Sequence, residues 1–386
     1  MLASRSDIGM GPGRNATPEL EPRMSNDRYA TRRHKLLAEV RKKDVDTILV
    51  TNETNVRYLT GFTGDSTYLL LGPQLALLIS DSRYTTQIAE ECSGLDLFIR
   101  PHTQKMHESV GKVVKKAKLV KLGFEPGSVT VETFEQWKEQ VKTTDFVPCA
   151  GLVEDLRMVK DAGELAEIRL AIRLAEKGFA TLRATLRPDL TELEVAHDLE
   201  HAMRKFGSPG VSFPPIVGVG PRGALPHGRP SAARISDADS LLVDWGAISP
   251  GGYKSDLTRV LVTGKVSPKL EKVYGVVLNA QRLGIEAIRP GAKCRDVDAV
   301  ARQHIDQAGF GKYFGHSLGH GIGLNIHEGP RLAAISEQIL EPGMVVTVEP
   351  GIYIPNVLGV RIEDDILVTK EGCEVLTSVP KQFEEA

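Results

Sequence analysis

The chain has 386 residues, of which 41% are hydrophobic and 25% charged, ordinary values for a soluble globular protein of about two domains. A formal net charge of −2 offers no basic surface for nucleic acid, and no apolar run reaches the roughly 18 residues that cross a membrane. The cysteines at positions 92, 149, 294 and 373 form no CxxC pair, so the sequence predicts neither a disulfide framework nor a zinc ribbon and suits a reducing cytoplasm.

Residues 1–27 are polar, rich in glycine and proline, and lack the apolar core of a secretion signal. We therefore expect a disordered tail over 1–27. Met24 opens a segment that continues directly into a helix-like stretch, which makes it a second candidate for the start of translation.

Residues 28–150 alternate between helix-like pieces, at 32–43 and 110–117, and strand-like pieces, which lie at 46–51, 66–71, 76–80 and 119–124. This alternation predicts an α/β layer with its own core. We interpret 147–160 as a connection and 151–386 as a second domain.

Three helix starts are predicted in the second domain. Asp161 and Glu164 have capping-box spacing ahead of a long amphipathic run, and Thr191 begins a helix that ends near Phe206. A third helix starts at Ser267 and ends before Pro290. The stretch 187–207 resembles 289–311, which indicates two related halves unless two amphipathic helices are alike by chance.

Two familiar motifs are better explained as turns. The GVGPRG segment (218–223) matches GxGxxG, but its proline and those that follow prevent the helix that a dinucleotide site requires. The GHSLG segment (315–319) matches a nucleophile elbow, but no acidic residue lies between its serine and His327, so the order of a hydrolase triad fails. HExxH is absent, because His327 and Glu328 are followed by Gly-Pro.

Four carboxylates flank apolar, strand-like runs. Asp244 ends LLVD and Asp256 precedes LTRVLV, while Glu349 follows MVVTV and Glu363 precedes DILV. The two pairs predict two hairpins, the second with its turn near residues 355–359. Four negative charges in a partly buried space repel one another, and two divalent cations would neutralise them. The charge balance therefore predicts a dinuclear metal site.

His320, in the glycine-rich segment 319–323, is the proposed fifth ligand. Oxygen-rich ligation with one imidazole suits a divalent transition ion, with Mn²⁺ preferred and Co²⁺ or Zn²⁺ as alternatives. Each residue alone has a simpler reading, such as a turn aspartate, a capping glutamate at Glu349 or a core histidine. Their joint occurrence favours the metal site.

With these motifs, and with NVRYLTGFTGDSTYLLL (55–71) and DSRYTTQ (81–87), the chain resembles the pita-bread metallopeptidases, specifically the Xaa-Pro branch that holds aminopeptidase P and prolidase. The resemblance implies a creatinase-type α/β N-terminal domain and an α+β pita-bread catalytic domain with pseudo-twofold halves. It also implies that Asp256 and Glu363 bridge two metals, that Asp244 completes one, and that His320 and Glu349 complete the other.

Further roles follow only from this resemblance. His227 and His327 would be catalytic-pocket histidines, His316 would line the substrate side, and Arg361 would support Glu363. Glu349 would also carry the proton from water to the leaving nitrogen. The expected enzyme is a metallo-exopeptidase that cleaves the Xaa-Pro bond at the N-terminus of dipeptides or short peptides, as a cytoplasmic homodimer.

Alternatives remain open. A methionine aminopeptidase-like or creatinase-like hydrolase could use the same fold, and so could a non-catalytic peptide-binding relative. All five ligand types are present, which argues against the last of these. The sequence does not decide between a dipeptide and a longer peptide.

Overall fold

The computed structural model describes residues 27–382. The predicted tail and the Met24 start lie outside these residues, apart from Asp27, which begins the first helix. Among the described residues, no helix is long and apolar enough to cross a membrane.

The N-terminal part is a six-stranded sheet with helices on both faces, in the strand order β4-β3-β2-β1-β5-β6. Strands β1, β2 and β3 pair antiparallel, and the other pairs are parallel. The strands are β1 (Ile48–Val50), β2 (Tyr68–Gly72), β3 (Leu75–Ser80), β4 (Asp96–Ile99), β5 (Lys121–Phe124) and β6 (Asp145–Pro148). The helices are α1 (Asp27–Arg41), α2 (Glu53–Thr60), α3 (Thr85–Glu91), α4 (Met106–Lys116) and α5 (Val131–Gln140).

Side-chain alternation along β1 explains the two helical layers. Ile48 and Val50 belong to the buried cluster under α1 and α2, whereas Leu49 belongs to the cluster under α4 and α5 that contains Trp137. Successive residues of a strand face opposite sides, so a continuous apolar strand needs cover on both. The expected α/β layer is confirmed.

The stretch 147–160, which we interpreted as a plain connection, contains the helix α6 (Leu152–Met158). Its apolar residues Val153 and Leu156 pack into the core of the N-terminal domain. The connection is therefore partly helical, because it has a surface to bury.

The second domain opens with α7 (Ala162–Thr185) and α8 (Glu192–Lys205), both of which begin with the predicted capping boxes. Three antiparallel strands follow in the order β7-β8-β9: β7 (Ile216–Val219), β8 (Ser240–Trp245) and β9 (Leu257–Val262). The motif GVGPRG forms the short 3₁₀ turn η2 (Gly220–Ala224) and no α-helix, as expected.

The second half starts with α9 (Pro268–Ala287) and α10 (Cys294–Gln307). A five-stranded sheet has the order β11-β10-β12-β15-β16, and β13 pairs with β14. The strands are β10 (Gly319–Gly321), β11 (Glu328–Leu332), β12 (Val345–Val348), β13 (Gly351–Ile354), β14 (Leu358–Arg361), β15 (Asp364–Val368) and β16 (Cys373–Val375).

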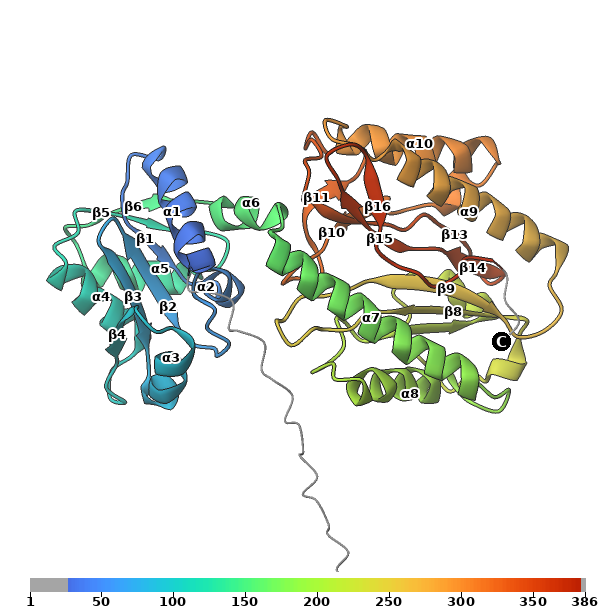
Figure 1. Cartoon of the computed structure of the whole chain (residues 1–386), viewed down its shortest axis with the longest axis horizontal. Coiled ribbons are helices and arrows are strands. Elements are labelled where there is room, and N and C mark those ends of the chain that lie inside the picture. Colours follow the sequence, from blue (N-terminus) through green and yellow to red (C-terminus); the bar gives the residue numbers. More distant parts are fainter. Residues whose placement is uncertain (1–26, 383–386) are drawn as a thin grey trace, which may run out of the picture.

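The two halves of the second domain form layers, with a helix pair on each outer side and the strands between them (Figure 1). One core joins α7 and α8 to β7, β8 and β9, and the other joins α9 and α10 to the later strands. Between residues 27 and 382, one isolated backbone bridge, between Thr258 and Glu363, links the two sets of strands. This arrangement agrees with the internal repeat in the sequence and brings the two hairpins together.

Candidate metal centre

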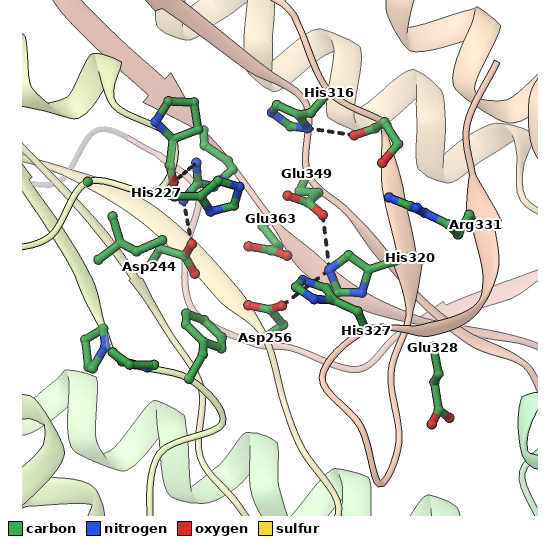
Figure 2. Close-up of a pocket in the computed structure, with 18 of the residues that line it drawn as sticks. His227, Asp244, Asp256, His316, His320, His327, Glu328, Arg331, Glu349 and Glu363 are labelled. Carbon is green, nitrogen blue, oxygen red and sulfur yellow. Dashed lines mark hydrogen bonds and ion pairs between the residues drawn. The ribbon is translucent and has the colours of Figure 1, made fainter. Parts of the chain in front are cut away.

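A cavity of about 840 Å³ opens between the two halves of the second domain. All nine predicted site residues line it: His227, Asp244, Asp256, His316, His320, His327, Glu349, Arg361 and Glu363. Figure 2 shows the four carboxylates and His320 gathered at its floor. The fold thus brings together residues that are more than 100 positions apart.

Asp244 reaches the cavity because of the alternation along β8. Leu241, Val243 and Trp245 face α7 and α8, and the Trp245 indole is stacked on Phe179 at 4.1 Å between ring centroids. Asp244 lies on the opposite face and is directed towards the second half of the domain. Asp256 immediately precedes β9. The two strands of the predicted hairpin therefore each supply a carboxylate, one on either side of the turn.

His320 is held in β10 by close backbone packing. A Cβ atom at Gly319 would lie 1.9 Å from the carbonyl oxygen of Thr347, and a Cβ at Gly321 would lie 2.0 Å from that of Gly329. Only glycine permits strands to approach this closely. The flanking glycines therefore allow the imidazole of His320 to reach the site.

Glu349 and Glu363 stand where two paired strands break. Strand β12 pairs with β15 and β13 pairs with β14, and Glu349 and Glu363 lie at the junctions between these pairs. The predicted second hairpin is thus confirmed, but it is interrupted at both carboxylates. The interruption lets Glu349 and Glu363 leave the regular ladder and turn into the cavity.

The closest cluster contains Asp256, His320 and Glu363, whose ligand atoms all lie within 4.8 Å of one another. The Nε2 atom of His320 is 3.3 Å from a carboxylate oxygen of Glu349 and 3.6 Å from one of Asp256. Asp244 lies on the other side of the cluster, where it accepts a hydrogen bond from Arg361.

The tautomer of His320 suits a metal ligand. Its Nδ1 atom lies 3.1 Å from the carbonyl oxygen of Gly321, which can only accept, so Nδ1 carries the proton. Burial lowers the pKa of His320 to about 3, so Nε2 has no proton near neutral pH. Its lone pair therefore faces the carboxyl groups of Asp256 and Glu349, as the lone pair of a metal-binding histidine would.

Within residues 27–382, three of the four carboxylates, those of Asp256, Glu349 and Glu363, also lack a cationic partner, and the fourth, that of Asp244, is paired with Arg361 through one oxygen only. Asp244, Asp256 and Glu363 are 6%, 5% and 1% exposed, and the Oδ1 atom of Asp244 is buried without a hydrogen-bond partner. Burial raises the pKa of all three, and neighbouring carboxylates raise those of Asp256 and Glu363 further. Among the described residues, no lysine or arginine nitrogen lies within 4 Å of the side-chain carboxylate oxygens of Asp256, Glu349 or Glu363. These donors fit divalent cations.

The carboxylate that Arg361 contacts is not the one that we expected. We predicted that it supports Glu363, but its direct carboxylate partner is Asp244. It reaches Glu363 only through Thr258, whose hydroxyl accepts from Arg361 Nε at 3.0 Å and donates to Glu363 at 2.6 Å. The guanidinium of Arg361 pairs with Asp244 because these two buried side chains lie on the same side of the cluster.

The three accessory histidines line the cavity in different ways. His316 uses both nitrogens: Nδ1 donates to the carbonyl of Ser317 at 2.7 Å, and Nε2 accepts from the hydroxyl of Tyr353 at 2.9 Å. The His327 ring meets the His320 ring edge to face, with centroids 4.4 Å apart. His227 lies on an exposed loop at the opposite wall.

The sequence did not reveal Thr258, Tyr353 or Glu328. Thr258 lies two residues after Asp256, so strand alternation could have placed it on the same face. The hydroxyl of Tyr353 joins Arg361 to His316, and no local pattern indicates this. Glu328 points away from the cluster (Figure 2) and binds side chains from the connection between the domains.

Comparison with known proteins gives two matching families. Metallopeptidase family M24 matches residues 166–370, and the Creatinase/Prolidase N-terminal domain matches residues 32–159. An Xaa-Pro dipeptidase of Pyrococcus furiosus is 34% identical over 91% of this chain and 99% of its own. The solved structure of an Xaa-Pro dipeptidase from Bacillus anthracis is 41% identical, covers 93% of this chain and 100% of its own, and has a TM-score of 0.88. A prolidase from Pyrococcus horikoshii is 33% identical, covers 92% and 99%, and has a TM-score of 0.83.

Proposed function

Because this chain belongs to metallopeptidase family M24 and carries a Creatinase/Prolidase N-terminal domain, we propose that it is a dinuclear-metal Xaa-Pro dipeptidase. The observation that carries the proposal is the position of His320, whose Nε2 lies 3.3 Å from Glu349 and 3.6 Å from Asp256 in a cavity lined by four carboxylates. The names of the relatives supply the substrate class.

Five residues would hold the two metal ions. Asp256 and Glu363 would be shared by both ions, Asp244 would complete one, and His320 and Glu349 would complete the other. The donor set has four carboxylates and one imidazole, for which we propose Mn²⁺, with Co²⁺ or Zn²⁺ as alternatives. When bound, such ions polarise a carbonyl group and lower the pKa of water, which makes hydrolysis feasible near neutral pH.

The remaining residues would act on the substrate. Glu349 would take a proton from the attacking water and give it to the prolyl nitrogen that leaves. His327 and His227 both line the cavity, and an imidazole N–H from either would donate to the developing oxyanion. His316 would form part of the substrate wall, since both its nitrogens are already engaged.

The cavity supports a dipeptide over a longer peptide. Its rim carries the guanidinium groups of Arg229 and Arg331, and among the described residues neither has a carboxylate within 4 Å. A free C-terminal carboxylate could pair with one of these cations only if the substrate ends close to the scissile bond. Phe213 and Pro214 give the cavity an apolar wall for a prolyl ring.

The location and assembly remain part of the proposal. All four cysteines are free thiols, which agrees with a reducing cytoplasm. The homodimer rests on the family resemblance, and light scattering of the purified chain would measure it.

A substrate panel tests the function. The Mn²⁺-loaded protein is incubated with an Xaa-Pro dipeptide, an Xaa-Pro tripeptide, a Met-initiated peptide and creatine, and the metal-depleted protein serves as control. We expect cleavage of the dipeptide well above that of the tripeptide, and no activity without metal. Cleavage of only the Met-initiated peptide or creatine would reject the proposal.

A further inference from the structure

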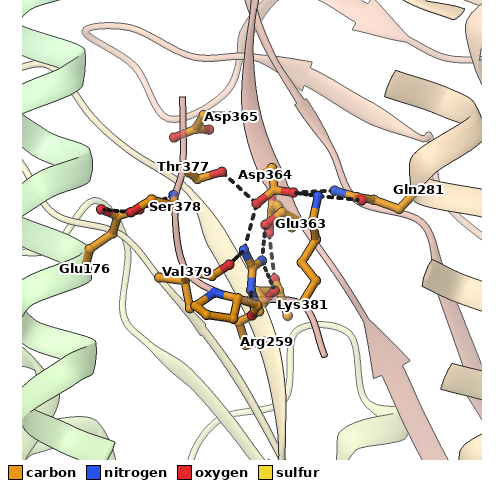
Figure 3. Close-up of polar contacts among 12 residues, drawn as sticks. Glu176, Arg259, Gln281, Glu363, Asp364, Asp365, Thr377, Ser378, Val379 and Lys381 are labelled. Atoms are coloured by element: carbon orange, nitrogen blue, oxygen red, sulfur yellow. Dashed lines mark hydrogen bonds and ion pairs between the residues drawn. The ribbon is translucent and has the colours of Figure 1, made fainter. Parts of the chain in front are cut away.

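A buried polar network adjoins Glu363 of the candidate metal centre (Figure 3), and the other residues labelled there do not line the cavity. Its centre is the ion pair between Arg259 of β9 and Asp364 of β15, at 2.7 Å, with side chains 3% and 1% exposed. These two residues come from different halves of the second domain. The network therefore crosses the seam at which the carboxylates of the two halves meet.

All five N–H donors of Arg259 are used. One Nη donates to the carbonyl oxygens of Thr258 and Glu363, at 2.9 and 2.6 Å, and the other donates to Asp364 and to the carbonyl of Val379. The Nε donates to the carbonyl of residue 380 at 3.0 Å. Arg259 thus holds the backbone on both sides of the bridge between Thr258 and Glu363.

Asp364 is equally well satisfied. Besides Arg259, its oxygens accept from the hydroxyl of Thr377 at 2.6 Å, from the amide of Gln281 at 2.6 Å and from the ammonium of Lys381 at 2.7 Å. Gln281 belongs to α9, so the helix layer of the second half takes part.

Residues 377–381, which we call the C-terminal segment, tie this network to both halves. Ser378 donates to Glu176 of α7 at 2.9 Å, and Val379 packs against the core of the first half. The carbonyl of Lys381 accepts from the hydroxyl of Tyr274 on α9 at 2.6 Å. The segment therefore spans the two halves with contacts on each side.

We propose that Arg259, Asp364 and the C-terminal segment form a clamp that fixes the spacing of Asp256 and Glu363 and thereby sets the affinity for divalent metal. The two carboxylates belong to different halves and repel each other. Next to them, among the described residues, one backbone bridge and two side-chain hydrogen bonds cross the seam: Thr258 to Glu363 at 2.6 Å and the Asp256 N–H to Asp365 at 3.1 Å. None of the clamp residues touches the cavity, so they are positioning residues. This inference rests on the proposed function only in that the cluster binds metal.

The expected loss of metal affinity can be estimated from other proteins, in which residues that orient the metal ligands have been removed. Loss of such a partner typically weakens metal binding by about 10- to 100-fold. Lys381 supplies one of four partners of Asp364, and Arg259 remains to neutralise the carboxylate when it is removed. We expect Lys381→Met to fold and to bind Mn²⁺ about 10-fold more weakly than the unaltered chain.

Isothermal titration of the metal-free full chain with MnCl₂ measures this affinity without substrate, and thermal unfolding is recorded alongside. Arg169→Met is the matched control, because it removes a cation that pairs with Glu374 at 2.7 Å and ties the chain end to α7 without reaching Asp364. We expect Arg169→Met to leave the affinity unchanged and Lys381→Arg to restore it.

Thr377→Val, which removes one hydrogen bond to Asp364, is the second variant should Lys381→Met fail to fold, and it should also weaken binding. Unchanged Mn²⁺ affinity in a folded clamp variant, with or without a lower melting temperature, would overturn the proposal. An unaltered chain that binds no divalent ion would overturn the proposed function as well. The two failures are therefore distinguishable.

Discussion

At the scale of single residues, the two histidines that meet edge to face should have separate roles. We expect His327→Ala to lower kcat by about 10²- to 10³-fold, because an oxyanion donor is lost, and to retain both metal ions, because His327 stands outside the cluster of Asp256, His320 and Glu363. Elemental analysis and peptide-cleavage kinetics measure both effects. His320→Ala is the control and should lose metal. Loss of both ions from His327→Ala would show that its role is wrongly assigned.

The sequence could predict the residues of the candidate site better than their contacts. Each of the four carboxylates adjoins an apolar run: Asp244, Asp256, Glu349 and Glu363. A charged residue beside a buried strand needs a partner or a metal, so the sequence alone indicates a site. The partner of Arg361 could not be predicted in this way. Asp244 lies 117 positions earlier in the chain, and only the packing of β8 beside β14 decides that it, and not Glu363, receives the guanidinium.

At the scale of elements, strand β10 depends on the absence of side chains at its glycines. A methyl group at Gly319 would meet the carbonyl oxygen of Thr347 at 1.9 Å, so Gly319→Ala must displace β10 from β12. We expect it to lower the stability by about 1–3 kcal/mol and to abolish metal binding through His320.

Gly315→Ala is the matched control for this variant. Gly315 lies four residues earlier, has no atom within 4 Å of the position of an added Cβ, and should tolerate the methyl group. Melting temperature and Mn²⁺ titration of both variants check the prediction. Full metal binding by Gly319→Ala would contradict it.

Long helices with strong start signals were predictable, and short elements were not. The capping boxes at Asp161 and Thr191 place the starts of α7 and α8. Strands β4 and β6, with four residues each, have no periodicity long enough to recognise. Helix α6 was missed because its stability comes from packing on the N-terminal domain, a contact that the local sequence does not show.

At the scale of the whole molecule, the buried acids make the metal-free protein sensitive to pH. Burial raises the pKa of Glu349 to about 8, and burial with nearby carboxylates raises those of Asp256 and Glu363 well above their usual range. A carboxyl group with a raised pKa in the folded state stabilises the fold below its unfolded pKa of about 4, and this contribution is lost as the pH rises through the folded pKa.

We therefore expect the melting temperature of the metal-free protein to fall between about pH 7.5 and pH 8.5, a window in which unfolded histidines, with an ordinary pKa of about 6.5, are largely neutral. Bound Mn²⁺ should remove this decline and add about 2.7 kcal/mol per site at a hundredfold excess over Kd. Differential scanning fluorimetry with and without Mn²⁺ measures both curves. A metal-free melting temperature that rises across this window would contradict the assignment of the cluster.

One buried hydrophobic cluster contains residues of both domains. Ile168 and Ile172 of α7, together with Ile322 and Leu324, pack in the same core as α1 and β1. Arg157, from the linking helix α6, is buried against Glu328 beside the cavity. Removing residues 32–159 would strip that core and leave the Glu328 charge without one of its partners. The two regions matched by separate family models therefore share one core, and we expect them to unfold together, in one transition that calorimetry can record.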